Sequence, residues 1–176
     1  MKVGEIMSID LETCRADDTL NRAAQIMWEH DCGVVPVLDD ESRVIGMLTD
    51  RDICIAAYTQ GCPLWQISVS SACSRSVHAC KLNDSLQTAE ATMRAAQVHR
   101  VPVVDDDGKI YGIVSLGDLA RHAHKPRQKA DGLSYESIAS TLAAISQPVS
   151  EEAPNGVSNG APHGRSESSS QGDAMV

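Results

Sequence analysis

Arg100-Val-Pro-Val-Val-Asp-Asp-Asp-Gly-Lys-Ile-Tyr-Gly-Ile-Val-Ser-Leu-Gly-Asp118 is the stretch that decides the fold of this chain. Two apolar runs, residues 101–104 and 110–114, flank a turn cluster in which Gly108 can adopt a positive φ, and this order predicts a β-hairpin. Ser115 and Asp118 then have the spacing of a capping box, which predicts that a helix begins directly after the hairpin.

The same pattern occurs earlier, in Val35-Pro-Val-Leu-Asp-Asp-Glu-Ser-Arg-Val-Ile-Gly-Met-Leu-Thr-Asp-Arg-Asp52. A shift of 66 residues aligns the two halves without a gap and places Asp52 on Asp118. Each copy predicts, in order, a short extended piece at residues 13–14 or 79–80, a helix, the hairpin and a closing helix. Two such copies packed sheet against sheet would share one hydrophobic core.

The helices of each copy follow from apolar spacing and capping residues. Apolar residues recur at helical spacing after Asp18 and Asp84, which are the predicted N-caps. The closing helices are expected at about residues 50–58 and 116–122. Pro36 and Pro102 lack a backbone donor, which predicts a strand start or a sheet edge for both.

Composition limits the classes of function. The chain has 176 residues, no Phe and a net charge of −9, which argues against a nucleic-acid-binding or membrane-binding protein. No signal peptide or membrane-spanning stretch is recognisable, so a cytoplasmic location is expected. The six Cys show no C-x-x-C pair, and most are expected to be reduced and buried.

The segments outside the two copies have separate expectations. Residues 61–66 form a connector whose Trp65 should pack on the domain. After the basic segment 121–127, residues 137–145 are expected to form a helix that docks on the module or on a neighbour. Residues 148–176 are rich in Ser, Gly, Glu, Asn and Pro and are expected to be disordered.

The motifs Gly46-Met-Leu-Thr-Asp-Arg-Asp52 and Gly112-Ile-Val-Ser-Leu-Gly-Asp118 resemble those of the cystathionine-β-synthase (CBS) domain, here as a tandem pair. The resemblance implies an α/β fold of two β-α-β-β-α repeats about a pseudo-two-fold axis. Repeat 1 would span residues 1–60 and repeat 2 residues 67–125, with a helical extension at 126–147. It also implies clefts for AMP, ADP or ATP, pairing into a homodimer, and regulation of an unknown partner by a stand-alone module.

The resemblance assigns Asp52 and Asp118 to the ribose of such a ligand, and Thr49 and Ser115 to ribose or phosphate. The chemistry agrees, because an ionised Asp can accept hydrogen bonds from both ribose hydroxyls and a helix N-terminus favours phosphate. Both motifs also have a purely structural explanation as capping boxes, and the two roles are compatible.

The two copies differ in their cations. His99 and Arg100 precede the second hairpin where the first copy has Gly33-Val34, whereas Arg51 stands where the second copy has Gly117. The cleft at Ser115 and Asp118 is therefore expected to be the stronger phosphate site, with Arg100 beside it and Arg51 reaching across the axis. Solvated surface cations are the alternative for both arginines. The adenine slot is expected at Val35, Pro36, Val101 and Pro102.

The sequence favours a non-catalytic adenine-nucleotide sensor that requires no cofactor and binds no metal. One alternative is an interaction protein whose clefts stay empty. Another is a redox or metal sensor that uses the Cys residues or His122-x-His124, although this His pair lacks accompanying ligands at fixed spacing. An enzyme is disfavoured, since no nucleophile–base pair has a sequence signature.

Overall fold

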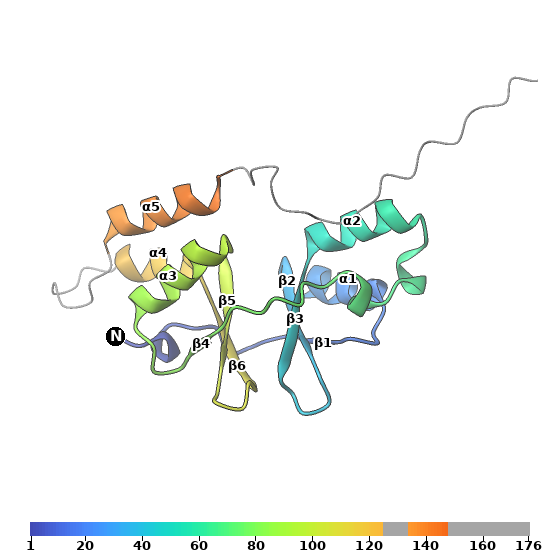
Figure 1. Ribbon diagram of the computed structural model, residues 1–176, viewed down its shortest axis with the longest axis horizontal. Coiled ribbons are helices and arrows are strands. Elements are labelled where there is room, and N and C mark those ends of the chain that lie inside the picture. Colours follow the sequence, from blue (N-terminus) through green and yellow to red (C-terminus); the bar gives the residue numbers. More distant parts are fainter. Residues whose placement is uncertain (125–133, 148–176) are drawn as a thin grey trace, which may run out of the picture.

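The computed structural model describes residues 1–124 and 134–147. It has two units of the same order, with a hairpin of each unit at the centre and the helices outside (Figure 1). The first unit holds β1 (Cys14–Arg15), α1 (Leu20–Glu29), β2 (Val34–Leu38), β3 (Val44–Thr49) and α2 (Asp50–Gln60). The second holds β4 (Cys80–Lys81), α3 (Leu86–Ala96), β5 (Arg100–Val104), β6 (Ile110–Ser115) and α4 (Leu116–His124).

Each unit contains one three-stranded sheet with the hairpin that the sequence predicts. The strand orders are β1-β2-β3 and β4-β5-β6, in which the first pair is parallel and the hairpin antiparallel. Val35 pairs with Leu48 in the first unit, and Val101 pairs with Val114 at the equivalent place in the second. The predicted β-α-β-β-α repeat and its α/β class are therefore confirmed.

Pro36 and Pro102 lie inside their strands, so the predicted strand start is wrong, but each lies at a local edge. Pro36 is the third residue of β2, and β1 pairs with β2 only at Val37 and Leu38. The short first strand therefore begins to pair only after the proline and needs no donor from it. Pro102 has the same position beside β4.

The first helix of each unit begins one residue later than predicted, because the neighbouring hydroxyl is the cap. The Thr19 side chain accepts from the Arg22 amide, and Ser85 accepts from the Thr88 amide. Asp18 and Asp84 instead close the preceding turns by accepting from backbone amides, each at 2.8 Å. The α2 and α4 helices start where predicted and extend two residues further.

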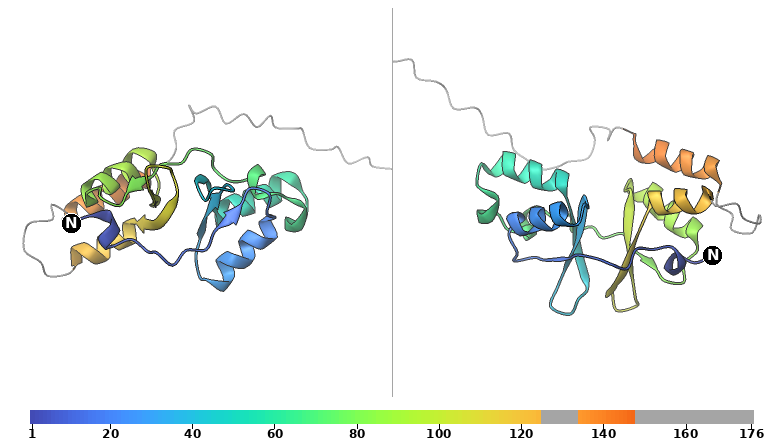
Figure 2. Two further views of the ribbon diagram at one scale, coloured as in Figure 1. Left: turned by 90° about the horizontal axis from the view of Figure 1, so that it is seen from below. Right: turned by 180° about the vertical axis from the view of Figure 1, so that it is seen from behind.

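The two units have separate hydrophobic cores, so the expectation of one shared core is wrong. The segment before each unit packs on the other unit. Val3, in the 3₁₀ turn η1 (Val3–Glu5), lies in the second core, whereas Ile67 and Val69 lie in the first. The N-terminal segment consequently crosses from the second unit to the first (Figure 2). The domain boundaries drawn along the chain stay a prediction.

Backbone contacts join the two units at several places. Ser8 forms a bridge with Ile113 of β6, and Ser74 forms one with Met47 of β3. The hairpin ends also meet, since the Val44 amide donates to the Gly108 carbonyl at 3.1 Å. These contacts come from both crossing segments and from the hairpin ends. They therefore set the position of one unit relative to the other on several sides of the space between them.

A fifth helix, α5 (Tyr135–Ile145), packs on α3 and α4 of the second unit. This confirms the docking helix predicted at residues 137–145. Glu90, 5% exposed beneath α5, accepts from Thr141 Oγ1 at 2.6 Å and from Ser137 Oγ at 2.8 Å. Arg94 Nη2 donates to Glu90 at 2.8 Å, so a buried polar cluster holds α5. Residues 125–127 of the basic segment and the tail from 148 lie outside the described residues.

Two burial expectations are wrong. Trp65, in the 3₁₀ turn η2 (Leu64–Gln66), has 65% of its surface exposed, because Leu64 supplies the apolar contact of this turn instead. Of the six cysteines, only Cys14 and Cys80 are buried, while Cys54 and Cys62 are exposed. Within the described residues, no helix is long and apolar enough to cross a bilayer.

Candidate ligand-binding clefts

A cavity of about 390 Å³, the first cleft, lies between the units at the start of α2. The first unit contributes Val34, Met47, Thr49 and Asp52, and the second contributes residues 97–100 and Pro102. Residues 74, 76 and 78 of the crossing segment complete the lining. The volume falls within the roughly 300–1,000 Å³ typical of small-molecule sites, and the wall mixes apolar and polar groups as such sites do.

Thr49 and Asp52 form the predicted capping box at the wall of the first cleft. Thr49 donates from its amide and from its hydroxyl to Asp52 Oδ2, at 2.9 and 2.7 Å, and its hydroxyl accepts from the Asp52 amide at 3.2 Å. Asp52 Oδ1 accepts no hydrogen bond and no ion pair from residues 1–124 or 134–147. One oxygen therefore holds the helix start, and the other is available to a ligand.

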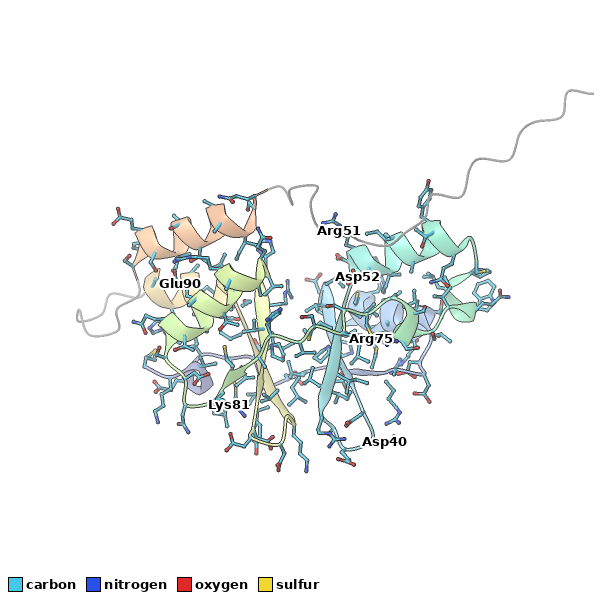
Figure 3. The ribbon with its side chains drawn as sticks, viewed as in Figure 1. Asp40, Arg51, Asp52, Arg75, Lys81 and Glu90 are labelled. Carbon is cyan, nitrogen blue, oxygen red and sulfur yellow. The ribbon has the colours of Figure 1, made fainter. Side chains whose placement is uncertain are left out.

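Two arginines line the first cleft from opposite units. Arg51 belongs to α2 and Arg100 begins β5, where it pairs with Ser115 of the neighbouring strand. Both side chains are exposed, and neither makes an ion pair within the described part of the chain. Arg51 and Asp52 lie at the end of α2 that points toward the second unit (Figure 3). Two cations without carboxylate partners beside a helix N-terminus form a favourable environment for phosphate.

A second cleft of about 290 Å³ lies at the equivalent place on α4. Ser115 and Asp118 head it, and Asp10, Glu12 and Arg121 are among its other lining residues. Val34 and Arg100, which are equivalent positions in the two units, each line both clefts. The two cavities are therefore related by the internal repeat.

Asp118 has the same capping contacts as Asp52 and one more. Ser115 donates from its amide and hydroxyl to Asp118 Oδ2, at 2.8 and 2.6 Å. Arg121 Nη2 donates to the other oxygen, Oδ1, as an ion pair. Glu12 lies 3.5 Å from His30 across the same cleft. Both oxygens of Asp118 are thus engaged by the protein itself.

The sequence-predicted residues divide between the clefts and the cores. Thr49, Arg51, Asp52, His99, Arg100 and Pro102 line the first cleft, and Ser115, Asp118 and Arg100 line the second. Arg51 does not line the second cleft. Val35 and Val101 are fully buried in the two cores, and Pro36 is buried and lines neither cleft.

Sequence reasoning missed Val34, Met47 and Arg121 as lining residues. Val34 aligns with Arg100 under the 66-residue shift, and this alignment was a signal that could have found it. Arg121 follows Asp118 by three residues on a helix, which is a spacing that brings side chains into contact. Met47 belongs to the motif of the first copy, and its backbone bridge with Ser74 of the crossing segment is a long-range contact that the motif does not reveal.

The cysteines and histidines do not assemble into a site in the described residues. No group of three or more His, Cys, Asp or Glu side chains has the arrangement of a metal site there. His122 is buried, and the side chain of His124 lies outside the described residues. Burial raises the pKa of the Cys14 thiol to about 11 and also raises the pKa of Cys80, which keeps both protonated and unreactive at neutral pH.

Comparison with known proteins agrees with the two-unit architecture and its paired clefts. A family model described as CBS domain matches residues 3–58 and 69–125. The chain belongs to the CBS domain family. Hypoxic response protein 1 of Mycobacterium tuberculosis is 36% identical over 118 residues, which cover 67% of this chain and 82% of that protein. The CBS domain-containing protein YhcV of Bacillus subtilis is 35% identical over 144 residues, covering 82% and 94%.

Solved CBS domain structures share this fold. The crystal structure of hypoxic response protein 1, which holds two coordinated zinc ions, covers 72% of this chain and all of its own with a TM-score of 0.64 and 34% identity. The crystal structure of CBSX2 in complex with AMP covers 69% of this chain and 95% of its own, with a TM-score of 0.61 and 24% identity. At that identity the likeness to CBSX2 shows the fold alone.

Proposed function

We propose that this CBS domain pair is a regulatory sensor that binds an adenine nucleotide, AMP, ADP or ATP, in its first cleft. The observation that carries the proposal is the first cleft itself. It unites an acceptor, Asp52 Oδ1, and two arginine side chains, none of which has a partner among residues 1–124 and 134–147, with an apolar wall. The AMP complex of CBSX2, which has the same fold, supports this choice of ligand class.

Each part of the nucleotide has a chemically suitable partner in the first cleft. Asp52 Oδ1 would accept from the ribose hydroxyls, since an ionised carboxylate offers several acceptor positions. Arg51 and Arg100 would bind the phosphate through charge-assisted hydrogen bonds. Val34, Met47 and Pro102 would contact the adenine. We therefore prefer the first cleft to the cleft at Ser115 and Asp118 that the sequence favoured. Arg51 and Arg100 make no ion pair among the described residues, whereas Arg121 of the second cleft is paired with Asp118.

The position of the arginines suggests how binding becomes a signal. Arg51 belongs to the first unit and Arg100 to the second, so a phosphate held by both would couple the two units. A ligand shifts a conformational equilibrium only through its difference in affinity between the states. A partner protein that prefers one arrangement of the units would then sense the nucleotide as a coupling free energy.

The outer face of the first unit is the surface that we assign to a second copy of the chain. Trp28 of α1 is 87% exposed and Tyr58 of α2 is 88% exposed. Trp28 aligns with Arg94, which bonds to α5 on the second unit, and none of the described helices covers Trp28 on the first unit. An isologous dimer buries the same patch of both copies, which would remove these two aromatic side chains from water. Sedimentation velocity should show dimers that Trp28→Glu dissociates and Ile9→Glu, an exposed control outside α1 and α2, does not.

Isothermal titration calorimetry with AMP, ADP, ATP, NADH and S-adenosylmethionine tests the proposed ligand class. We expect micromolar binding of at least one adenine nucleotide and much weaker binding of the matching guanine nucleotide. Absence of heat and of any thermal shift with the whole panel would overturn the proposal. That result would favour an interaction protein whose clefts stay empty.

A further inference from the structure

The two clefts differ most at the aspartate that each presents to a ligand. Asp118 has only 10% of its side chain exposed, and Arg121 Nη2 is bonded to Oδ1, the oxygen that does not cap α4. In the first unit the corresponding oxygen of Asp52 has no partner among the described residues. An incoming ribose would meet an oxygen with no partner among the described residues in one cleft, and in the other an oxygen that already pairs with Arg121.

The two aspartates differ in their partners because of one position in each closing helix, residue 55 in α2 and residue 121 in α4. Arg121 lies three residues after Asp118, within reach of its carboxylate. The 66-residue shift places Ile55 at the equivalent position of the first unit, and an isoleucine side chain has no donor. Ile55 is 49% exposed and Arg121 is 72% exposed, so neither side chain fills a core.

A second difference lies in the same turn. The second unit has Gly117 where the first has Arg51. A Cβ at Gly117 would lie in ordinary van der Waals contact with Arg121 Nη1, at 3.5 Å, so position 117 borders the guanidinium beside Asp118. Each unit thus carries one arginine in the first turns of its closing helix. In the first unit this arginine lines the cleft and has no ion pair in the described part of the chain, and in the second it is bonded to the aspartate.

We propose that the ion pair between Arg121 and Asp118 weakens ribose binding in the second cleft, so that the first cleft fills first and the second binds an adenosine ligand about tenfold more weakly. The proposal rests on the proposed function and adds the order in which the two clefts fill. The pairing is reversible because Arg121 is largely exposed, and displacing such a pair costs about tenfold in affinity at most. A change that draws Arg121 away from Asp118 would strengthen binding in the second cleft.

Reciprocal exchange of the two residues tests the proposal by calorimetry with AMP. The wild-type chain should bind one AMP in the first cleft and a second about tenfold more weakly. Arg121→Ile should strengthen the second site about tenfold, and an added Asp118→Asn should remove that gain. Ile55→Arg should pair with Asp52 and weaken the first site about tenfold. Circular dichroism and the unfolding midpoint serve as folding controls for both variants.

Each outcome separates this inference from the proposed function. Wild-type binding of one AMP with no effect of Arg121→Ile and of Ile55→Arg would overturn the inference and leave the function standing. Two equal sites in the wild-type chain would also overturn it. Absence of AMP, ADP and ATP binding by the wild-type chain and by Arg121→Ile alike would overturn both.

Discussion

The first and second clefts are built from equivalent residues, and yet their electrostatic surroundings differ. Ser76 and His78 of the first cleft align with Asp10 and Glu12 of the second under the 66-residue shift. Arg100, which lines both, is the cation that the clefts share. The comparison teaches that a repeat can preserve the shape of a ligand site in both copies while a few substitutions change which copy suits an anion.

The comparison also separates the scaffold from the selective residues. Both clefts use Ser or Thr together with Asp as a capping box, and both boxes have the same donor and acceptor pattern. These contacts stabilise the helix start whether or not a ligand is present. The residues that we expect to decide which cleft binds the nucleotide take no part in the capping boxes. They are Arg51, Ile55 and Arg121.

The largest expected change in AMP affinity is the difference between the same substitution at Asp52 and at Asp118. Asp52→Asn retains an oxygen for the capping contacts but replaces the second acceptor with a donor, so we expect the AMP dissociation constant to rise about 100-fold, or about 2.7 kcal/mol. Asp118→Asn should change it less than about threefold, because Oδ1 of Asp118 already pairs with Arg121. Calorimetry on both variants measures the difference, and equal losses would contradict the ranking of the clefts.

The next effect concerns α5, which distinguishes the outer faces of the units. Thr141 is fully buried, donates to Glu90 at 2.6 Å and accepts from Arg94 Nη2 at 2.6 Å. Thr141→Val would leave both partners short of a hydrogen bond and should lower the free energy of unfolding by about 1–3 kcal/mol. Urea denaturation measures the change.

Ser140→Ala is the matched control for the α5 cluster. Ser140 is exposed on the same helix, and surface substitutions of this kind change stability by about 0.5 kcal/mol or less. If Thr141→Val and Ser140→Ala had the same free energy of unfolding, the polar cluster would contribute nothing specific to the docking of α5. The second unit would then be covered by apolar contacts alone.

The sequence predicted the features that depend on local spacing. The hairpins, the two capping boxes and the repeat follow from residues close together in the chain, and the structure confirms them. The N-caps at Asp18 and Asp84 were misplaced by one residue because acid and hydroxyl are both good caps, and the preceding turn uses the acid.

The features that the sequence did not predict depend on contacts between distant segments. Val3 packs with the second unit and Val69 with the first, and no local pattern specifies this exchange. The exchange brings the crossing segments beside the clefts, and the arrangement of the units places Arg51 together with Arg100. The Arg121 contact, in contrast, follows from helical spacing and could have been predicted from the sequence.

A smaller effect should separate phosphate recognition from ribose recognition. Arg51→Gln removes one cation from the first cleft and should weaken AMP binding about tenfold, while adenosine, which lacks the phosphate, should bind as before. Arg75→Gln is the control, because Arg75 is an exposed arginine of the crossing segment that lines neither cleft. An equal loss for adenosine would show that Arg51 supports the fold of the cleft rather than the phosphate.

The smallest expected change in AMP affinity concerns Asp10 and Glu12, two acids that line only the second cleft. Ser76→Asp gives the first cleft the acid that Asp10 supplies to the second, and it should weaken AMP binding about threefold through repulsion across water. Raising the salt concentration should remove this loss, since the Debye length at physiological salt is about 8 Å. The loss caused by Ile55→Arg should persist, because a bonded guanidinium occupies the aspartate directly. A salt-resistant effect of Ser76→Asp would mean that residue 76 contacts the ligand, and the difference between the clefts would then be steric rather than electrostatic.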